Sequence, residues 1–307
     1  MLAKDSIIMN RFAVLMPLAA GACWGASGIF VRTLSAAGFN TITVMFSRSI
    51  TGSVLVFLFL LFYDRSLLKI HLRDIPLFLS LSINGYLLMN TCYNLTVARL
   101  TLSLASVLLG LCPIFVLLFG ALFFHEKITL VKVSCMLAAL TGCALLAGVF
   151  EKNSDIAWSF LGLATGLGSA LFNAVYTLNS KQLTSAGYNA LTINLYAFAF
   201  TSLVLTPFAD WNLFVGDVCS DPLNGSLVYL AQALVTSIMP NFLYTNAIQR
   251  IDSGNAAILS CGAEPVSAMI FGILLYNEIP SVLGILGMVI TVSALAVLTR
   301  SDKSKQL

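Results

Sequence analysis

Two ionisable side chains of this chain lie deep inside long apolar stretches. Glu264 lies about twelve residues into the stretch that begins near Ser253, and a helical rise of about 1.5 Å per residue places it near mid-membrane. Arg48 lies about seven residues into an earlier stretch, in its outer half. An ionisable group at membrane depth costs roughly 2.5–3.5 kcal/mol, so it must face a cavity, a partner or the protein interior.

These two groups could bind the opposite charges of a solute. We expect Glu264 to bind a cationic group or to carry a coupling proton, and Arg48 to bind a carboxylate. Pro265 removes one backbone donor and frees a carbonyl close to Glu264. The alternative is structural, with Arg48 capping carbonyls or pairing with an acid so that helices are held together.

Polar and aromatic side chains recur at helical spacing in other apolar stretches. Tyr86, Asn90, Tyr93 and Asn94 fall at i, i+4, i+7 and i+8, which is one face of a helix. Lipid offers such side chains no partners, so they must point inward, either into a cavity or into hydrogen bonds between helices. The predicted solute-binding residues are Trp24, Arg48, Tyr86, Asn90, Tyr93, Asn94, Asn173, Tyr176, Asn241, Tyr244, Ser260 and Glu264.

Histidine and cysteine usage argues against catalysis and metal binding. The chain has two histidines, His71 and His125, both between apolar stretches, and seven cysteines without a Cys-x-x-Cys pair. Only one acid, Glu264, lies at mid-membrane depth, so the sequence offers no paired acids there. It also shows no nucleophile with a base and no cluster of metal ligands. The sequence predicts no enzyme, no cofactor and no metal site. A net charge of +3 without a basic block also argues against nucleic acid.

The elements that must position these residues are membrane-spanning helices. The chain is 59% hydrophobic and 9% charged, whereas soluble domains carry roughly 25% charged residues. A transmembrane helix needs about 20 mostly apolar residues. Ten segments meet that length: Phe12–Val31, Thr41–Tyr63, Ile75–Ala98, Thr101–Phe124, Ile128–Val149, Ala157–Ser180, Ala190–Ala209, Leu227–Ile248, Ser253–Tyr276 and Ser281–Thr299. We therefore predict an all-α integral membrane protein.

An internal repeat divides these segments into two halves. Matching residues recur at a nearly constant offset: Asn90 with Asn241, Tyr93 with Tyr244, Arg99 with Arg250, Pro113 with Pro265, Gly120 with Gly272 and Glu126 with Glu278. Five crossings per half mean that the second half enters the membrane from the opposite side. We predict two inverted five-helix repeats, residues 12–149 and 157–299, followed by a polar tail at 300–307.

The basic residues predict the orientation. With a cytoplasmic N-terminus, the outer side receives Arg32, Arg99 and Lys152, whereas most other Lys and Arg residues face the cytoplasm. Such a bias follows the positive-inside rule and places both termini in the cytoplasm. The outer loop 210–225 carries three aspartates and no Lys or Arg, which agrees.

Three smaller features have structural interpretations. Gly21 and Gly25, four residues apart, allow two helices to approach closely. Glu126 and Glu278 lie at helix junctions on opposite membrane faces, where they anchor or cap helices; gating by this inverted pair is the alternative. The tail Ser301–Leu307 is polar and is predicted to be disordered.

The chain resembles the drug/metabolite transporter superfamily and its EamA-like branch. The resemblance rests on the stretch from Pro113 to Glu126 (PIFVLLFGALFFHE), its partner from Glu264 to Glu278 (EPVSAMIFGILLYNE), and Arg48 in the second helix. It covers the chain from Phe12 to Thr299. The resemblance implies a central cavity between the halves, alternating access, and export or exchange of small solutes such as amino acids.

From residues and resemblance together we expect a multi-pass transporter of the cell (plasma or inner) membrane. Its expected partners are the lipid bilayer and a small-molecule solute, with a coupling proton and a homodimer left open. The alternatives are a channel-like facilitator, although no selectivity filter is visible in the sequence, and a non-transporting accessory membrane subunit.

Overall fold

A computed structural model describes residues 13–100, 102–150, 159–220, 222–277 and 279–305, and within these ranges the chain is helical, without strands. The helices are α2 (Leu15–Gly25), α3 (Ser27–Ala36), α4 (Thr41–Tyr63), α5 (Ile75–Ser80), η3 (Leu81–Leu88), α6 (Met89–Arg99), α7 (Leu102–Leu109), α8 (Cys112–Phe124), α9 (Leu130–Leu146), α10 (Phe160–Ser185), α11 (Ala190–Leu205), α12 (Trp211–Ser220), α13 (Pro222–Gln232), η5 (Ala233–Ile238), α14 (Met239–Ile248), α15 (Ser253–Tyr276) and α16 (Val282–Lys305). Short 3₁₀ turns, η1 (Arg65–Leu68), η2 (Leu72–Asp74) and η4 (Thr206–Phe208), join some of them.

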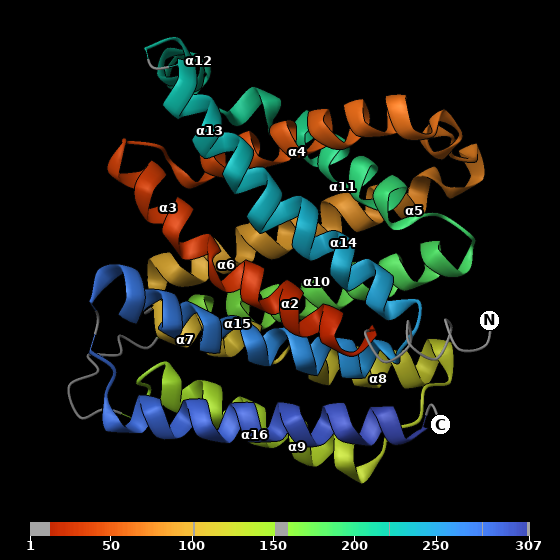
Figure 1. Ribbon diagram of the computed structural model, residues 1–307, viewed down its shortest axis with the longest axis vertical. Helices are drawn as coiled ribbons and strands as arrows, with labels where there is room; N and C mark the ends of the chain where they lie inside the picture. Colours follow the sequence, from red (N-terminus) through yellow and green to blue (C-terminus); the bar gives the residue numbers. More distant parts are fainter. Residues whose placement is uncertain (1–12, 101, 151–158, 221, 278, 306–307) are drawn as a thin grey trace.

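Nine helices in the described ranges are long and apolar enough to cross a membrane. The segment predicted at Ile128–Val149 contains the shorter apolar helix α9, which has 17 residues. At about 1.5 Å per residue, α9 is somewhat shorter than a hydrocarbon core of roughly 30 Å. It lies along α16 for much of its length (Figure 1). A tenth crossing at α9 therefore stays a prediction.

Two predicted boundaries are wrong. The first apolar helix continues through α3 to Ala36, five residues beyond the predicted end. The helix α16 runs to Lys305, so the residues of the predicted disordered tail up to that point are helical. Polar residues in the last turn of a helix remain compatible with helical structure because they reach water there.

The outer loop predicted at 210–225 contains a helix instead. In α12, Leu213, Phe214 and Val218 pack against an apolar cluster from α3, α4 and α13. Asp210 accepts a hydrogen bond from the backbone N–H of Leu213 at 3.1 Å, as an N-terminal cap does. The apolar residues of this loop recur at helical spacing, which indicates a helix. Its acidic composition led to the prediction of a loop instead.

Two of the membrane-spanning helices contain π-helical turns. The segment η3 interrupts the run from α5 to α6, and η5 interrupts the run from α13 to α14. In each run a polar helix segment follows within a few residues, with Asn90 after η3 and Asn241 after η5. A π turn carries one extra residue per turn and therefore changes which side chains face the interior.

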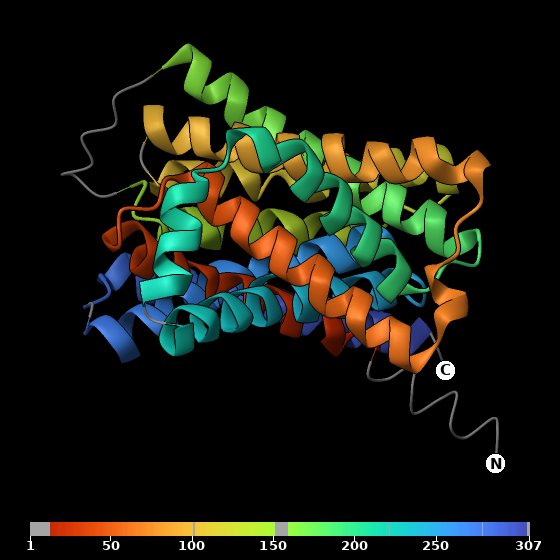
Figure 2. The same ribbon diagram turned by 90° about the horizontal axis from the view of Figure 1, so that it is seen from above.

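The most extensive helix pairs join the two predicted halves: α9 with α16, α2 with α15, α6 with α10, and α4 with α11. Figures 1 and 2 show these long helices lying side by side across the bundle. At Gly85 in η3, an added Cβ would lie 2.7 Å from the Cα of Tyr176 in α10. Such close backbone approaches bring the polar faces of η3, α6 and α10 together.

Candidate functional site

A chamber of about 140 Å³ lies where helices of both predicted halves meet. It is lined by Trp24, Ser27, Arg48, Tyr86, Met89, Asn90, Tyr93, Leu109, Asn173, Tyr176, Thr236, Asn241, Cys261 and Glu264. Most of the solute-binding residues predicted from the sequence therefore line one cavity. We refer to it as the central chamber.

One wall of the central chamber is built around Arg48 of α4. Its Nη2 donates a hydrogen bond to Oδ1 of Asn90 at 2.7 Å, and its guanidinium lies 5.4 Å from the ring centre of Tyr86. The Nε of Arg48 and the hydroxyl of Tyr86 are buried and find no hydrogen-bond partner within the described residues. Buried polar groups are usually satisfied, so these two donors remain available for hydrogen bonds beside the chamber.

The part of the lining around Asn241 has the same hydrogen-bond frame as the part around Asn90, with different chemistry. Asn90 donates from Nδ2 to the carbonyl of Tyr86 at 2.8 Å, and Asn241 donates in the same way to the carbonyl of Ser237 at 2.7 Å. Whereas Asn90 accepts from Arg48, Asn241 accepts a hydrogen bond from the hydroxyl of Tyr176 at 2.7 Å. Each amide thus secures a helix just after a π turn and holds a second side chain at the chamber.

Glu264 enters the central chamber from α15. Within the described ranges we find no ion pair to its carboxylate, and Arg48 lines the same chamber without being its partner. Pro265 lies inside α15 and has no N–H, so the carbonyl of Cys261, four residues earlier, lacks its helical donor. The chamber lining therefore combines the carboxylate of Glu264 with the guanidinium of Arg48.

The central chamber adjoins a larger cavity of about 350 Å³. Trp24, Tyr93, Cys261 and Glu264 line both. The larger cavity extends past Arg32 toward the end of the bundle at which α9 and α15 terminate, where a third cavity of about 280 Å³ lies beside Ser281. This series of cavities leads away from the start of α15.

Three predicted residues do not line the central chamber. Tyr244 lies behind its wall, with its ring 5.6 Å from that of Trp24 and its hydroxyl 2.9 Å from the hydroxyl of Thr177. Ser260 is buried where α15 packs on Gly21, because its face of the helix meets α2. Asn94, one turn beyond Asn90, also lies outside the lining. Their contact with a solute stays a prediction.

Sequence reasoning missed Ser27, Met89, Leu109, Thr236 and Cys261 in the chamber lining. Ser27 follows Trp24 by three residues and so shares its helical face, which is a signal that the sequence does contain. Met89 and Leu109 carry no such signal, because an apolar residue facing a chamber looks like one facing lipid. The positions of Met89 and Thr236 depend on π turns that the sequence does not announce.

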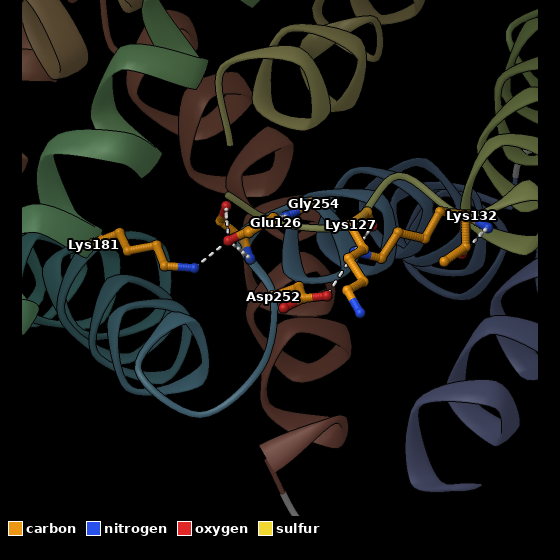
Figure 3. Close-up of polar contacts among 8 residues, drawn as sticks. Glu126, Lys127, Lys132, Lys181, Asp252 and Gly254 are labelled. Carbon is orange, nitrogen blue, oxygen red and sulfur yellow. Dashed lines mark hydrogen bonds and ion pairs between the residues drawn. The ribbon is translucent and has the colours of Figure 1, made fainter. Parts of the chain in front are cut away.

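A second polar cluster lies at the end of the bundle where α15 begins (Figure 3). Glu126, which follows α8, accepts hydrogen bonds from the backbone N–H and the hydroxyl of Ser253, at 2.9 and 2.7 Å, and forms an ion pair with Lys181 of α10. The prediction that Glu126 caps a helix is confirmed, although the helix is the distant α15. Glu278 lies outside the described residues.

Comparison with known proteins gives consistent matches along most of the chain. The model of the EamA-like transporter family matches residues 11–148 and 160–300. The pseudopaline exporter CntI of Pseudomonas aeruginosa is 27% identical over 293 residues, which cover 95% of this chain and 98% of that protein. An uncharacterized inner membrane transporter of Salmonella typhimurium, YicL, is 27% identical over 276 residues, 87% of this chain and 88% of that one.

A more distant relative is a probable terminal-alkyne amino-acid exporter of Streptantibioticus cattleyicolor, 22% identical over 230 residues and 74% of each chain. A solved protein structure superposes with a TM-score of 0.76 at 17% identity, covering 95% of this chain and 98% of that one. At that level of identity the superposition shows a shared fold alone.

Proposed function

This chain belongs to the EamA-like transporter family, and we propose that it exports or exchanges amino acids or related small metabolites across the cell membrane by alternating access. The family and the named relatives, two of them exporters and one an inner membrane transporter, indicate a multi-pass membrane exporter rather than an enzyme. The finer steps below, from topology to solute contacts, are the proposal.

We propose ten crossings arranged as two inverted repeats, with α9 as the fifth. Repeated local structures support the arrangement. His125 and Asn277 both end a helix in the left-handed conformation, at φ 55° and 52°, and their N–H groups bond the carbonyls of Gly120 and Gly272. The start of α2 and the end of α16 lie at the same end of the bundle (Figure 1), which supports termini on one side, the cytoplasmic one.

The observation that carries the proposed function is the central chamber with its unsatisfied groups. Arg48 offers an idle donor next to the idle hydroxyl of Tyr86, and Glu264 offers a carboxylate without an ion pair in the described ranges. A zwitterionic solute would place its carboxylate on Arg48 and its ammonium group on Glu264. Exchange of a proton for that ammonium group at Glu264 would couple transport to protons.

Chamber size and lining agree with a small amphipathic solute. A volume of about 140 Å³ is below the roughly 300–1,000 Å³ typical of sites for drug-sized ligands. Aromatic side chains such as Trp24 and Tyr176 can stack on the apolar part of a solute, while amides and hydroxyls meet its polar groups. Inverted repeats around a central site are the usual frame for alternating access.

The test is transport by the purified protein in liposomes loaded with a mixture of the common amino acids. We expect saturable efflux of a subset of them, which a Glu264→Gln variant reduces by at least about tenfold. Asp302→Asn, in the last turn of α16, is the matched acid-to-amide control and keeps normal flux. Single-channel currents would favour the channel-like alternative, and no flux of any amino acid would overturn the proposed substrate class.

A further inference from the structure

The polar cluster at the start of α15 connects the two predicted halves of the chain. Glu126 belongs to the first half, whereas its partners Lys181, Ser253 and Gly254 belong to the second. Figure 3 shows the Lys181 amine approaching Glu126 from one side and the first residues of α15 from another. The Glu126 side chain is only 6% exposed, so this contact is shielded from water.

Glu126 caps α15 from another helix. The residue at the capping position, Asp252, makes no side-chain capping bond to α15. The first N–H groups of a helix carry partial positive charge and need an acceptor, which the carboxylate of Glu126 supplies. Burial alone would raise the pKa of Glu126, but Lys181 and the hydrogen bonds from Ser253 outweigh it and lower the pKa below its usual range.

A second ion pair lies beside the first and also crosses between the halves. Lys132 of α9, 2% exposed, donates from Nζ to Asp252 at 2.6 Å and to the carbonyl of Lys127 at 2.9 Å. The Asp252 carboxylate therefore pairs with Lys132 of α9, and Glu126 instead of Asp252 accepts hydrogen bonds from the first N–H groups of α15. Two ion pairs thus join α8 and α9 of the first half to α10 and α15 of the second.

The central chamber is closed toward this cluster and adjoins further cavities toward the other end. The Tyr244 and Thr177 hydroxyls meet at 2.9 Å beneath the chamber, and both residues are buried. Farther on, Leu117 packs against Gly254 at the start of α15. The larger cavities, in contrast, extend past Arg32 and Ser281 at the opposite end of α15.

We propose that the Glu126–Lys181 and Lys132–Asp252 pairs are the gate of the transport cycle at the end where α15 begins, and that this structure has that gate closed. This inference rests on the proposed function, because a gate has a role only in a cycle that exposes the chamber to either side in turn. By the proposed topology the gate faces the cytoplasm.

The chemistry of the cluster suits a contact that must open repeatedly. Glu126 and Asp252 lie between the apolar helices, and Lys181 and Lys132 lie near the ends of theirs, so opening the halves separates the charges at the edge of the apolar region rather than in its middle. Hydration then offsets much of the lost attraction, whereas the same pairs at mid-membrane would be very costly to separate. The gate therefore biases the equilibrium between two states without locking it.

The test uses Cys261, which lines both the central chamber and the larger cavity. In a variant whose other cysteines are alanine, a membrane-impermeant cationic methanethiosulfonate reagent is applied to either side of oriented vesicles. We expect labelling from the side opposite the gate. Lys181→Gln should raise labelling from the gate side about tenfold, within the range of typical coupling effects, and Lys181→Arg should restore the original pattern.

Tyr229→Phe is the matched control, because it removes a hydrogen bond to Asp217 at 2.7 Å away from the gate. It should leave the sidedness unchanged. If Lys181→Gln and Glu126→Gln both fold and keep the original sidedness, or if Tyr229→Phe shifts it equally, the gate assignment is wrong.

Hydrogen exchange on the chain with all its cysteines gives a second measurement. Exchange at the amides of Ser253 and Gly254 should accelerate about tenfold in Lys181→Gln, because Glu126 is their acceptor. Unchanged exchange at these amides would also overturn the gate. Neither measurement needs a transported solute. One-sided labelling that Lys181→Gln shifts, without flux of any amino acid, would contradict the proposed substrate class but not the gate. Flux together with equal labelling from both sides would contradict the gate but not the proposed function.

Discussion

Substitution of Gly25 by alanine tests whether the contact between α2 and α15 sets the geometry of the central chamber. A Cβ at Gly25 would lie 2.5 Å from the carbonyl oxygen of Glu264 and 2.9 Å from the backbone nitrogen of Ala268. Ordinary contact begins at 3.4 Å, so the helices must part by roughly 0.9 Å, the difference between 3.4 and 2.5 Å. Backbone atoms cannot rotate away as a side chain could.

Two opposing effects set the expected magnitude. Overpacking costs about 1–3 kcal/mol, while alanine gains up to about 1 kcal/mol over glycine as a helix former. We expect Gly25→Ala to lower the free energy of unfolding by about 1–2 kcal/mol. Since α2 carries Trp24 and α15 carries Glu264, a shift of this size should also reduce flux by about tenfold or more, as misplacement of reacting groups does elsewhere.

Gly28→Ala is the matched control, because no atom lies within 4 Å of its added Cβ. The gain in helix propensity should leave this variant equally stable or more stable by up to about 1 kcal/mol. Thermal unfolding in detergent and flux in liposomes measure both variants. If Gly25→Ala is as stable and as active as Gly28→Ala, close packing of α2 on α15 does not position the chamber.

Three further predictions follow from single contacts. Arg48→Gln should weaken the binding of carboxylate-bearing solutes at least about tenfold, because hydrogen bonds to charged groups contribute roughly 1.5–3 kcal/mol. The matching amines without a carboxylate should bind as before, as measured by competition in the flux assay. Equal loss of binding for acids and amines would contradict this prediction. Tyr176→Phe should lower the free energy of unfolding by about 1–3 kcal/mol, because it leaves the buried Oδ1 of Asn241 without a donor, and thermal unfolding would refute this if the variant matched wild type. Folding lowers the pKa of Glu126, so its ionised carboxylate stabilises the folded protein. This contribution is fully present above the pKa of Glu126 in the unfolded chain, about 4.3, and is lost as the pH falls through its lower pKa in the folded protein. Acid unfolding monitored by circular dichroism should therefore lose this component in Glu126→Gln, and an identical pH dependence in the variant would refute the assignment.

The positions of the spans could be predicted because lipid imposes a simple rule on composition. The segments predicted at Thr41–Tyr63 and Ser253–Tyr276 coincide with α4 and α15, where polar residues or turns punctuate both ends. The predicted end of a span differs from the observed end where the helix continues beyond its last apolar residues, as it does to Ala36. Hydropathy also missed α12, because an amphipathic helix averages out over an acidic loop.

The chamber could be predicted in outline but not in its contacts. Residues such as Asn90 and Asn241 stood out because an amide in lipid needs a partner. Which partner each one takes depends on π turns and on helices far away in the sequence, so the bonds to Arg48 and Tyr176 could not be read from spacing. The same holds for Glu126, whose capped helix begins 127 residues later.

The two asparagines show how a repeated hydrogen-bond frame gives the central chamber two different walls. Both follow a π turn and both bond the carbonyl four residues earlier, so their Oδ1 atoms occupy related places in the two halves. One accepts from a guanidinium and the other from a phenol. The phenol is satisfied by that bond, whereas Arg48 keeps an idle Nε. Under the proposed function, an anionic group in the chamber would meet its strongest unfilled donor at Arg48, and this difference between the two asparagines would orient a zwitterion.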